Sequence, residues 1–220
     1  METKIVILGA SNHGKVVLDI LRDQKLSVVG FIDQTKPKDY LIGNKSVIGK
    51  EEDLAELIIN YSITHCIIAI GDNWTRSIIA KRIQQLHPSL AFISAISPYS
   101  YIAPDVTIGF GTIIAPGVII NTGSTIGNFC LLNTKSSLDH DGKMLDFSSL
   151  APGVTTGGNV AIGYCSAICL GANIIHRVTI GNHSIVGAGS LVLHSVEDYQ
   201  VVYGNPAKII RTRQASDPYL

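Results

Sequence analysis

The chain has 220 residues and a formal net charge of zero, and 15% of its residues are charged, against roughly 25% in an average soluble domain. This balance provides no basic stripe for a nucleic acid, and no apolar run approaches the ~20 residues of a membrane span. The first residues lead directly into a strand pattern without the features of a signal peptide, so we expect a cytoplasmic protein.

The first 97 residues alternate between apolar strand patterns and helical patterns. Strands are predicted over 4–10, 28–33, 65–72 and 91–96, and helices over 14–22, 50–61 and 73–86. Asn73 is a candidate N-cap for the last of these helices. Uninterrupted apolar strands that alternate with helices indicate a parallel sheet covered on both faces, so we expect a Rossmann-like α/β domain over residues 1–97.

Ligands of such sheets bind beyond the carboxyl ends of the strands. The turn "GASNHG", residues 9–14, leads into a helix, where backbone N–H groups can bind a phosphate. It departs from the dinucleotide motif G-x-G-x-x-G, because Ser11 occupies the second glycine position. Asp33 follows this turn at a spacing suited to binding a ribose or a base. Alternatively, Gly9 and Gly14 permit close packing and Asp33 caps a turn, and spacing alone does not decide between the two interpretations.

From Ile102 the sequence has a period of six residues. Fifteen of the sixteen residues at one position of the repeat are aliphatic or Met, and Thr156 is the exception. That series is Ile102, Ile108, Ile114, Ile120, Ile126, Leu132, Leu138, Met144, Leu150, Thr156, Ile162, Ile168, Ile174, Ile180, Val186 and Val192. The residue four places later in each hexad is small or Val. Hexapeptide repeats indicate a parallel β-helix with three hexads in each triangular coil, so residues eighteen apart stack.

The repeat resembles the left-handed parallel β-helix of the hexapeptide-repeat acyltransferases. The order of motifs along nearly the whole chain resembles the bacterial amino-sugar acetyltransferases, which include nucleotide-sugar N-acetyltransferases of the bacillosamine and perosamine pathways and sialic acid O-acetyltransferases. The motifs are "GASNHGKVV" at 9–17, "FID" at 31–33, "IGDN" at 70–73, "NTKSSLDHD" at 133–141, "LAPGVTTGGNVAIG" at 150–163 and "GNPAKIIR" at 204–211. The resemblance implies a β-helix domain over 98–220 that ends in a C-terminal cap.

The resemblance also implies an activity, a set of ligands and an assembly. It implies an acetyl-CoA-dependent N-acetyltransferase that acts on the amino group of a nucleotide-linked amino-deoxy sugar, works as a homotrimer and contributes to surface polysaccharide biosynthesis. The substrate residues that it implies are Ser11, Asn12, His13, Asp33, Gln34, Gly71 and Asn133. The residues that it implies near acetyl-CoA, in a groove between adjacent subunits, are Ser149, Gly158, Ala172, Thr179 and Ala188. Lys208 is a further candidate contact, to a phosphate of CoA.

His140 is the candidate general base. It lies two places after the inward Leu138, so its side chain is predicted to point out of the coil. Imidazole is suited to accept a proton from an attacking amine, and a carboxylate at its other nitrogen would hold the required tautomer. The resemblance assigns that carboxylate to Asp141, whereas spacing alone leaves Asp139 as a competitor. Gly158, one coil away, is predicted to leave room for a substrate, and its backbone N–H is a candidate oxyanion donor.

The sequence departs from the family pattern beside this site. Ser149 stands where the family usually has a second histidine, and Leu145 stands where glycine is common. Two other functions therefore stay open: O-acetylation of a sialic acid, and a trimeric sugar-nucleotide-binding scaffold without activity.

We expect no metal ion. His176 and His194 lie on the column of His140, where a zinc hydratase would need three histidines, but His140 is two coils farther away. The four cysteines form no C-x-x-C pair and are predicted to be buried thiols: Cys66, Cys130, Cys165 and Cys169.

Overall fold

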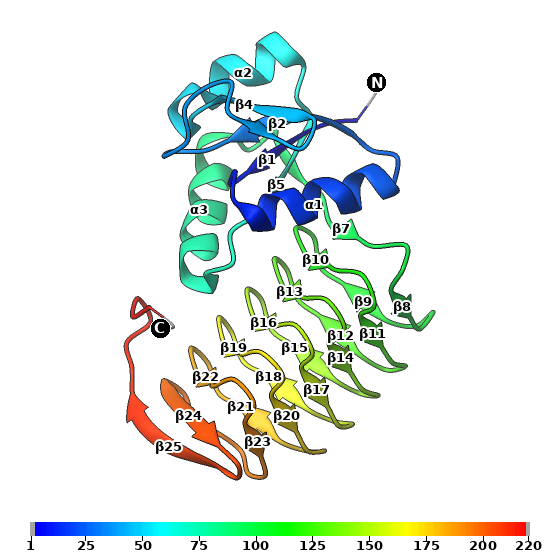
Figure 1. Ribbon diagram of the computed structural model, residues 1–220, viewed down its shortest axis with the longest axis vertical. Coiled ribbons are helices and arrows are strands. Elements are labelled where there is room, and N and C mark those ends of the chain that lie inside the picture. The colour runs from blue at the N-terminus through cyan, green and yellow to red at the C-terminus, as the bar shows by residue number, and fades with distance from the viewer. Residues whose placement is uncertain (1–2, 219–220) are drawn as a thin grey trace.

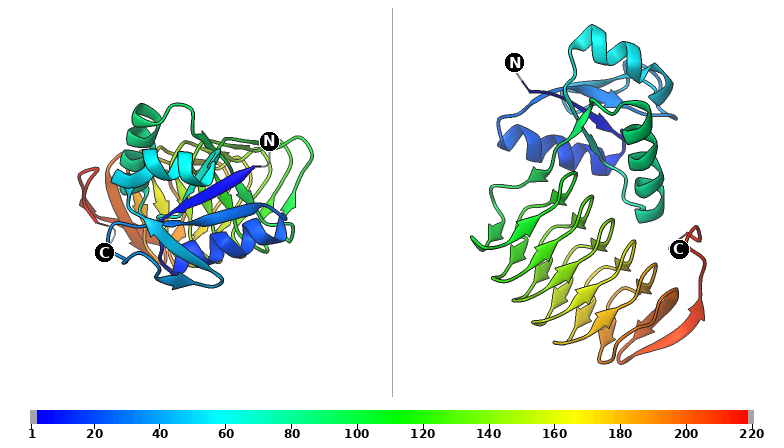
Figure 2. Two further views of the ribbon diagram at one scale, coloured as in Figure 1. Left: turned by 90° about the horizontal axis from the view of Figure 1, so that it is seen from above. Right: turned by 180° about the vertical axis from the view of Figure 1, so that it is seen from behind.

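The computed structural model describes residues 3–218 as an α/β domain placed at one end of a triangular prism of short strands (Figures 1 and 2). The predicted fold class, a Rossmann-like α/β domain followed by a left-handed parallel β-helix, is confirmed. Across residues 3–218, none of the helices combines the length and the apolar character that crossing a membrane requires.

The α/β domain contains one six-stranded sheet in the order β3-β4-β2-β1-β5-β6. Its elements are β1 (Lys4–Leu8), α1 (Asn12–Asp23), β2 (Ser27–Ile32), β3 (Leu41–Ile42), β4 (Lys45–Gly49), the 3-10 helix η1 (Glu51–Asp53), α2 (Leu54–Tyr61), β5 (His65–Ile68), α3 (Asn73–Leu86) and β6 (Ala91–Phe92). The central strands β1, β2 and β5 are parallel and largely buried, as their uninterrupted apolar runs predict. The antiparallel hairpin β3–β4 is an addition that the sequence patterns did not predict.

Two local predictions in this domain are wrong. The N-cap of α3 is Asp72, whose carboxylate accepts a hydrogen bond from the backbone N–H of Thr75 at 2.7 Å, and Asn73 is instead a buried residue of the helix. The strand predicted over 91–96 is divided, because β6 belongs to the α/β sheet while β7 (Ala95–Ile96) pairs with β10 as the first strand of the prism.

The prism has three faces, and all of its strands except β24 and β25 have two residues. The first face contains β7 (Ala95–Ile96), β10 (Ile113–Ile114), β13 (Leu131–Leu132), β16 (Ser149–Leu150), β19 (Ala167–Ile168), β22 (Ile185–Val186), β24 (Gln200–Gly204) and β25 (Ala207–Thr212). The second face contains β8 (Tyr101–Ile102), β11 (Ile119–Ile120), β14 (Ser137–Leu138), β17 (Thr155–Thr156), β20 (Asn173–Ile174) and β23 (Leu191–Val192). The third face contains β9 (Thr107–Ile108), β12 (Thr125–Ile126), β15 (Lys143–Met144), β18 (Ala161–Ile162) and β21 (Thr179–Ile180).

From β7 to β23 the strands pair in parallel with strands eighteen residues away, so the predicted register is observed; the spacing shortens to sixteen residues only at the C-terminal end, where Ile185 pairs with Val201. Ile120 pairs with Leu138, for example, and Ile126 pairs with Met144. The second residue of nearly every strand points inward and joins one continuous hydrophobic core. The antiparallel pair β24–β25 continues the first face at its C-terminal end (Figure 1).

Helix α3 joins the α/β domain to the prism through Arg76, which is 1% exposed. Its guanidinium donates hydrogen bonds to the carbonyl oxygens of Phe129 and Phe147, in two successive turns between the third and first faces, at 2.9 and 3.1 Å. It also donates to the carbonyl of Ile70 at 2.8 Å and to the side chain of Asn73 at 2.6 Å. One buried cation therefore holds the α/β domain against two coils of the prism.

Aromatic rings extend this contact along the same corner of the prism. A column of rings runs down successive coils, with centroid separations of 4.8–5.8 Å. The column consists of Phe110, Phe129, Phe147, Tyr164, His183 and Tyr199. Phe92 and Trp74 of the α/β domain pack against it at Phe129 and His183. The two domains thus share one continuous packed boundary.

Replacing Arg76 by Met should lower the free energy of unfolding by about 3–5 kcal/mol, since buried carbonyls on both sides of the domain boundary lose a charged donor. Chemical denaturation at matched protein concentration measures this change. The control is Arg22→Met, which removes an exposed ion pair with Asp19 and should change stability by less than about 1 kcal/mol. Equal, small effects of the two substitutions would contradict the structural importance of Arg76.

Candidate functional site

His140 lies on an exposed turn between β14 and β15, at the corner where the second face meets the third. Its side chain is 52% exposed, as the outward phase of the repeat predicts. The ring Nδ1 lies 2.8 Å from the carboxylate oxygen Oδ2 of Asp141. Nδ1 therefore carries the hydrogen toward Asp141, and Nε2 is left as an acceptor that faces away from this contact.

The backbone of the turn explains how adjacent residues 140 and 141 can meet. Asp141 has a φ of 56°, in the left-handed region, so the chain bends there and the Asp141 carboxylate lies beside the His140 ring. Asp139 has a different role: its Oδ1 accepts hydrogen bonds from the backbone N–H of His140 at 2.8 Å and from Asn121 Nδ2 at 2.7 Å. The competition that spacing left open between the two carboxylates is thus resolved geometrically, because Asp141 contacts the ring and Asp139 holds the backbone.

The two carboxylates also set the electrostatics of the histidine. The hydrogen bond to Asp141 raises the pKa of His140 above its ordinary value of 6.5, and the negative charges of Asp139 and Asp141 act in the same direction. The hydrogen bond from Asn121 lowers the pKa of Asp139, so this carboxylate stays ionised. The ring at the corner is consequently a stronger base than a free histidine.

Gly158 lies directly beneath the His140 ring, one coil further along the prism. A Cβ atom at this position would collide with Nε2, Cε1 and Cδ2 of His140. The space that the sequence assigned to a substrate is therefore occupied by the histidine itself, and glycine is required here because the ring lies against the backbone. This contact holds the Nε2 edge of the ring next to the backbone of residue 158.

Four predicted substrate residues meet in a cavity of about 310 Å³ at the carboxyl ends of β1, β2 and β5. They are Ser11, Asp33, Gln34 and Gly71, together with apolar side chains such as Ile70 and Ile79.

Both carboxylate oxygens of Asp33 are already engaged. Oδ2 accepts from the N–H of Ala10 at 2.7 Å, and Oδ1 accepts from the backbone and hydroxyl of Thr35 and from the N–H of Lys36 at 2.8–3.0 Å. Burial raises the pKa of Asp33, but these hydrogen bonds outweigh it and the net shift is downward. The carboxylate joins two loops of the site, as the turn-capping interpretation holds.

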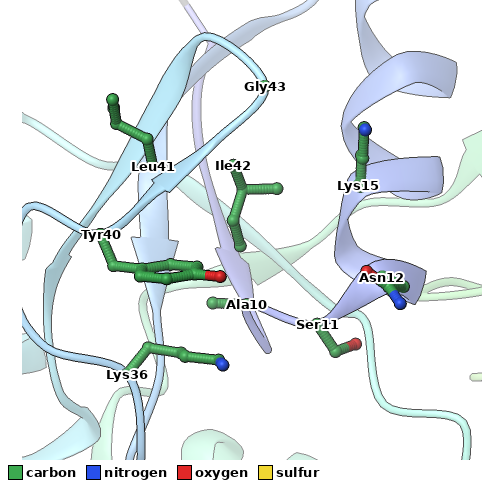
Figure 3. Close-up of a pocket in the computed structure, with 9 residues that line it drawn as sticks. All are labelled: Ala10, Ser11, Asn12, Lys15, Lys36, Tyr40, Leu41, Ile42 and Gly43. Carbon is green, nitrogen blue, oxygen red and sulfur yellow. The ribbon is translucent and has the colours of Figure 1, made fainter.

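A second cavity of about 410 Å³ opens between the start of α1 and the hairpin β3–β4 (Figure 3). The predicted residues Ser11 and Asn12 line one wall. Lys15, Lys36 and Tyr40 complete the lining, and Lys36 Nζ lies 4.8 Å from the centre of the Tyr40 ring. Sequence patterns missed these three residues because no motif links them. Only the hairpin brings Tyr40 opposite the N-terminus of α1.

Two predicted substrate residues lie outside both cavities. His13 is partly buried; burial and the charge of Arg76 lower its pKa to about 4, so it is neutral. Its Nε2 is buried and has no hydrogen-bond partner among residues 3–218. Asn133 lies at a different corner of the prism from His140, between the first and second faces, and its Nδ2 donates to the carbonyl of Leu150 at 3.4 Å.

The residues predicted near acetyl-CoA do not lie together on one chain. Ala172 points into the prism and is 0% exposed, so its side chain cannot line a groove. Ser149 is 7% exposed, and its hydroxyl accepts a hydrogen bond from Asn73 Nδ2 at 3.0 Å, so it belongs to the domain boundary. Ala188 is exposed at another corner. Thr179 lines a cavity of about 280 Å³ on the third face, together with Lys143 and Ala161, next to the corner that carries His140.

Comparison with known proteins gives matches to both parts of the chain. Residues 4–83 match the family model described as PglD N-terminal domain. A mutant perosamine N-acetyltransferase from Caulobacter crescentus, solved in complex with CoA and GDP-perosamine, is 31% identical with a TM-score of 0.89, over 94% of this chain and 97% of that chain. The acetyltransferase domain of PglB from Neisseria gonorrhoeae, in complex with acetyl coenzyme A, is 27% identical with a TM-score of 0.85, over 96% of this chain and 100% of that chain. WeeI from Acinetobacter baumannii is 28% identical with a TM-score of 0.82, over 94% of this chain and 100% of that chain.

Curated relatives match over shorter stretches. Serine acetyltransferase 2 of Arabidopsis thaliana is 39% identical over 80 residues, which are 33% of this chain and 25% of that protein. A chloramphenicol acetyltransferase of Agrobacterium fabrum is 38% identical over 72 residues, which are 33% of this chain and 34% of that protein. The matched region thus spans about a quarter to a third of the length of these curated relatives.

Replacing Gly158 by Ala should displace the His140 ring and separate it from Asp141, which would lower the pKa of His140 toward its ordinary value. Titration of the imidazole resonances by NMR measures this shift. The control is Gly71→Ala, because a Cβ atom at Gly71 has no neighbour within 4 Å and the φ of Gly71 is outside the left-handed region. An unchanged His140 titration in Gly158→Ala would contradict the proposed packing of the ring.

Proposed function

The chain belongs to the hexapeptide-repeat amino-sugar acetyltransferase family, and on this premise we propose that it transfers the acetyl group of acetyl-CoA to the amino group of a nucleotide-linked amino-deoxy sugar. The observation that carries this proposal is the His140–Asp141 pair at an exposed corner of a β-helix. Support comes from the similarity, over nearly the whole chain, to a perosamine N-acetyltransferase solved with CoA and GDP-perosamine.

In the proposed reaction, Nε2 of His140 accepts a proton from the sugar amine as its nitrogen attacks the thioester carbonyl carbon. A C–N bond forms, the C–S bond breaks, and the CoA thiolate leaves and takes up the proton that His140 had accepted. Asp141 keeps the hydrogen on Nδ1 and stabilises the transient imidazolium. General-base assistance of this kind contributes roughly 10²–10⁴-fold to a rate. A backbone N–H near Gly158 would stabilise the oxyanion.

In this proposal each of the two cavities of the α/β domain binds a different part of the nucleotide. The cavity that contains Lys15, Lys36 and the N-terminus of α1 suits the diphosphate, because two cations and unpaired helix N–H groups face it. The side chain of Ser11 makes no capping hydrogen bond and is available to the same group. The neighbouring cavity, with Gln34, Gly71 and apolar walls, suits the base and ribose. Ser11 lines both cavities and would lie at their junction.

Acetyl-CoA would approach His140 from the C-terminal end of the prism, since the α/β domain occupies the N-terminal end (Figure 1). The pantetheine arm has the length of about five extended residues, or roughly 16 Å, which corresponds to about three coils at roughly 4.8 Å each. His194 lies at that distance on the corner of His140, with His176 and Arg177 one coil nearer, and all three are exposed or partly exposed. These side chains and the exposed Lys208 are the proposed phosphate contacts.

A homotrimer is the proposed assembly. His140 and the groove at Thr179 are open to solvent on a single chain, so a second prism is needed to enclose the thioester. Exposed apolar side chains on the second face and its edge, including Tyr101 at 57%, Ile119 at 45% and Leu170 at 58%, suit such a contact. We place this assembly in the cytoplasm, where acetyl-CoA and sugar nucleotides for surface polysaccharides would be its substrates.

The function is tested most simply by His140→Ala. This substitution should lower kcat on a nucleotide-linked amino sugar at least about a hundredfold, because the proton acceptor is lost. The Kd for acetyl-CoA, measured by calorimetry, should stay within a few fold of the wild-type value. Near-normal turnover would remove His140 from the mechanism.

Asp141→Asn should shift the pH dependence of kcat/KM. His140 acts as a base only when neutral, and its raised pKa places the acidic limb of the wild-type profile above the ordinary histidine value. Removing the carboxylate lowers that pKa, so the limb should move to lower pH while kcat falls because the tautomer is no longer held. Asp141→Glu is the matched control that keeps the charge. A limb that stays in place, or moves to higher pH, would show that Asp141 does not set the basicity of His140.

A further inference from the structure

Thr156 breaks the pattern of the prism core. It is 3% exposed and points inward on β17, at the position where the other fifteen hexads place an aliphatic residue or Met. A buried hydroxyl needs a hydrogen-bond partner, so a threonine at this position requires an explanation that hydrophobic packing does not supply.

The partner is the backbone N–H of Asp139, the residue before His140, which donates to Thr156 Oγ1 at 3.2 Å. At the same place one coil earlier, the N–H of Asn121 donates to the carbonyl of Leu138 at 3.0 Å. One coil later, the N–H of Gly157 donates to the carbonyl of Ile174 at 2.8 Å. The coil of His140 thus uses a side-chain oxygen where its neighbours use a backbone oxygen.

The strand pairing is also shorter at the place where the Thr156 hydroxyl replaces a backbone acceptor. The pair β14–β17 retains one register pair, Ser137 with Thr155, whereas β11–β14 and β17–β20 on either side retain two. The ladder is therefore interrupted at the end of β14, where the turn that carries His140 begins. The prism departs from its own geometry at the coil of the candidate base.

Asp139 connects Thr156 to His140 through hydrogen bonds. Its N–H is held by Thr156, and its carboxylate holds both the N–H of His140 and the side chain of Asn121. Residue 139 is thereby fixed from the coils on both sides, and the bend at Asp141 follows two residues later. Thr156 and Asn121 therefore hold Asp139, and with it the start of the turn, from both sides.

We propose that Thr156 is a positioning residue for His140: its inward hydroxyl draws the backbone of Asp139 out of the regular ladder and so sets where the imidazole lies relative to Asp141 and Gly158. The inference rests on the proposed acetyl transfer. The hydroxyl is not needed to build a coil, since the other fifteen hexads are closed by aliphatic residues or Met at this position.

The test is Thr156→Val, which keeps the shape of the side chain but removes the acceptor. The N–H of Asp139 can then return to an ordinary ladder bond, so the unfolding midpoint should stay level or rise. The imidazole should move, and kcat should fall about tenfold or more, as small misplacements of catalytic groups do. The KM for acetyl-CoA should stay within about twofold, and the His140 titration measured by NMR should move to lower pH as the ring separates from Asp141.

Two further variants separate positioning from stability. Thr156→Ser restores the hydroxyl and should recover both kcat and the wild-type titration of His140. Thr107→Val removes an outward, exposed hydroxyl on β9 of the third face and should leave both unchanged.

The proposal is overturned if Thr156→Val retains wild-type kcat and His140 titration, or if it unfolds at the assay temperature, since the hydroxyl would then serve the fold. If the wild-type protein turns over no nucleotide-linked amine, the proposed function fails. The NMR comparison of His140 in the wild type and Thr156→Val still decides the positioning role in that case.

Discussion

The parallel stacking of residues eighteen apart is the constraint on which the rest of the structure depends. Because each coil pairs with the next in one register, a residue's column and corner are fixed by its place in the hexad. This register brings the His140 ring over Gly158 and the backbone of Asp139 against Thr156. A shift of one residue between these two coils would separate both contacts. The site is therefore a property of the coil register rather than of a mobile loop.

The α/β domain is held to this rigid frame by contacts that leave its two cavities open. Arg76 and Asn73 of α3 reach into the turns and strands of the prism, while the carboxyl ends of β1, β2 and β5 remain accessible. Asp33 joins the loops that line the two cavities through hydrogen bonds at both of its carboxylate oxygens. The two cavities of the α/β domain and the candidate base are thus carried on one packed body, which would suit the presentation of a bound amine to a fixed imidazole.

The sequence predicted the features that follow from periodicity and missed those that depend on single side chains. Period six predicted the prism, its register and the outward direction of His140. It did not distinguish Asp141 from Asp139. The left-handed φ that brings the Asp141 carboxylate to the ring recurs every six residues from Gly111 to Gly189, but only some of these positions carry the glycine that would have indicated it. Ser149 was expected beside acetyl-CoA, but its burial depends on Asn73, seventy-six residues earlier in the chain. Lys15, Lys36 and Tyr40 meet only because the unpredicted hairpin β3–β4 faces α1.

The central claim is that this protein transfers an acetyl group from acetyl-CoA to the amino nitrogen of a nucleotide-linked sugar. The most direct measurement follows CoA thiol release over UDP-, GDP- and dTDP-linked amino sugars and free sialic acid, with each product identified by mass spectrometry and NMR. The account predicts one thiol for each N-acetylated sugar nucleotide and no reaction with sialic acid. Release only with sialic acid, or binding of sugar nucleotides without any release, would contradict it.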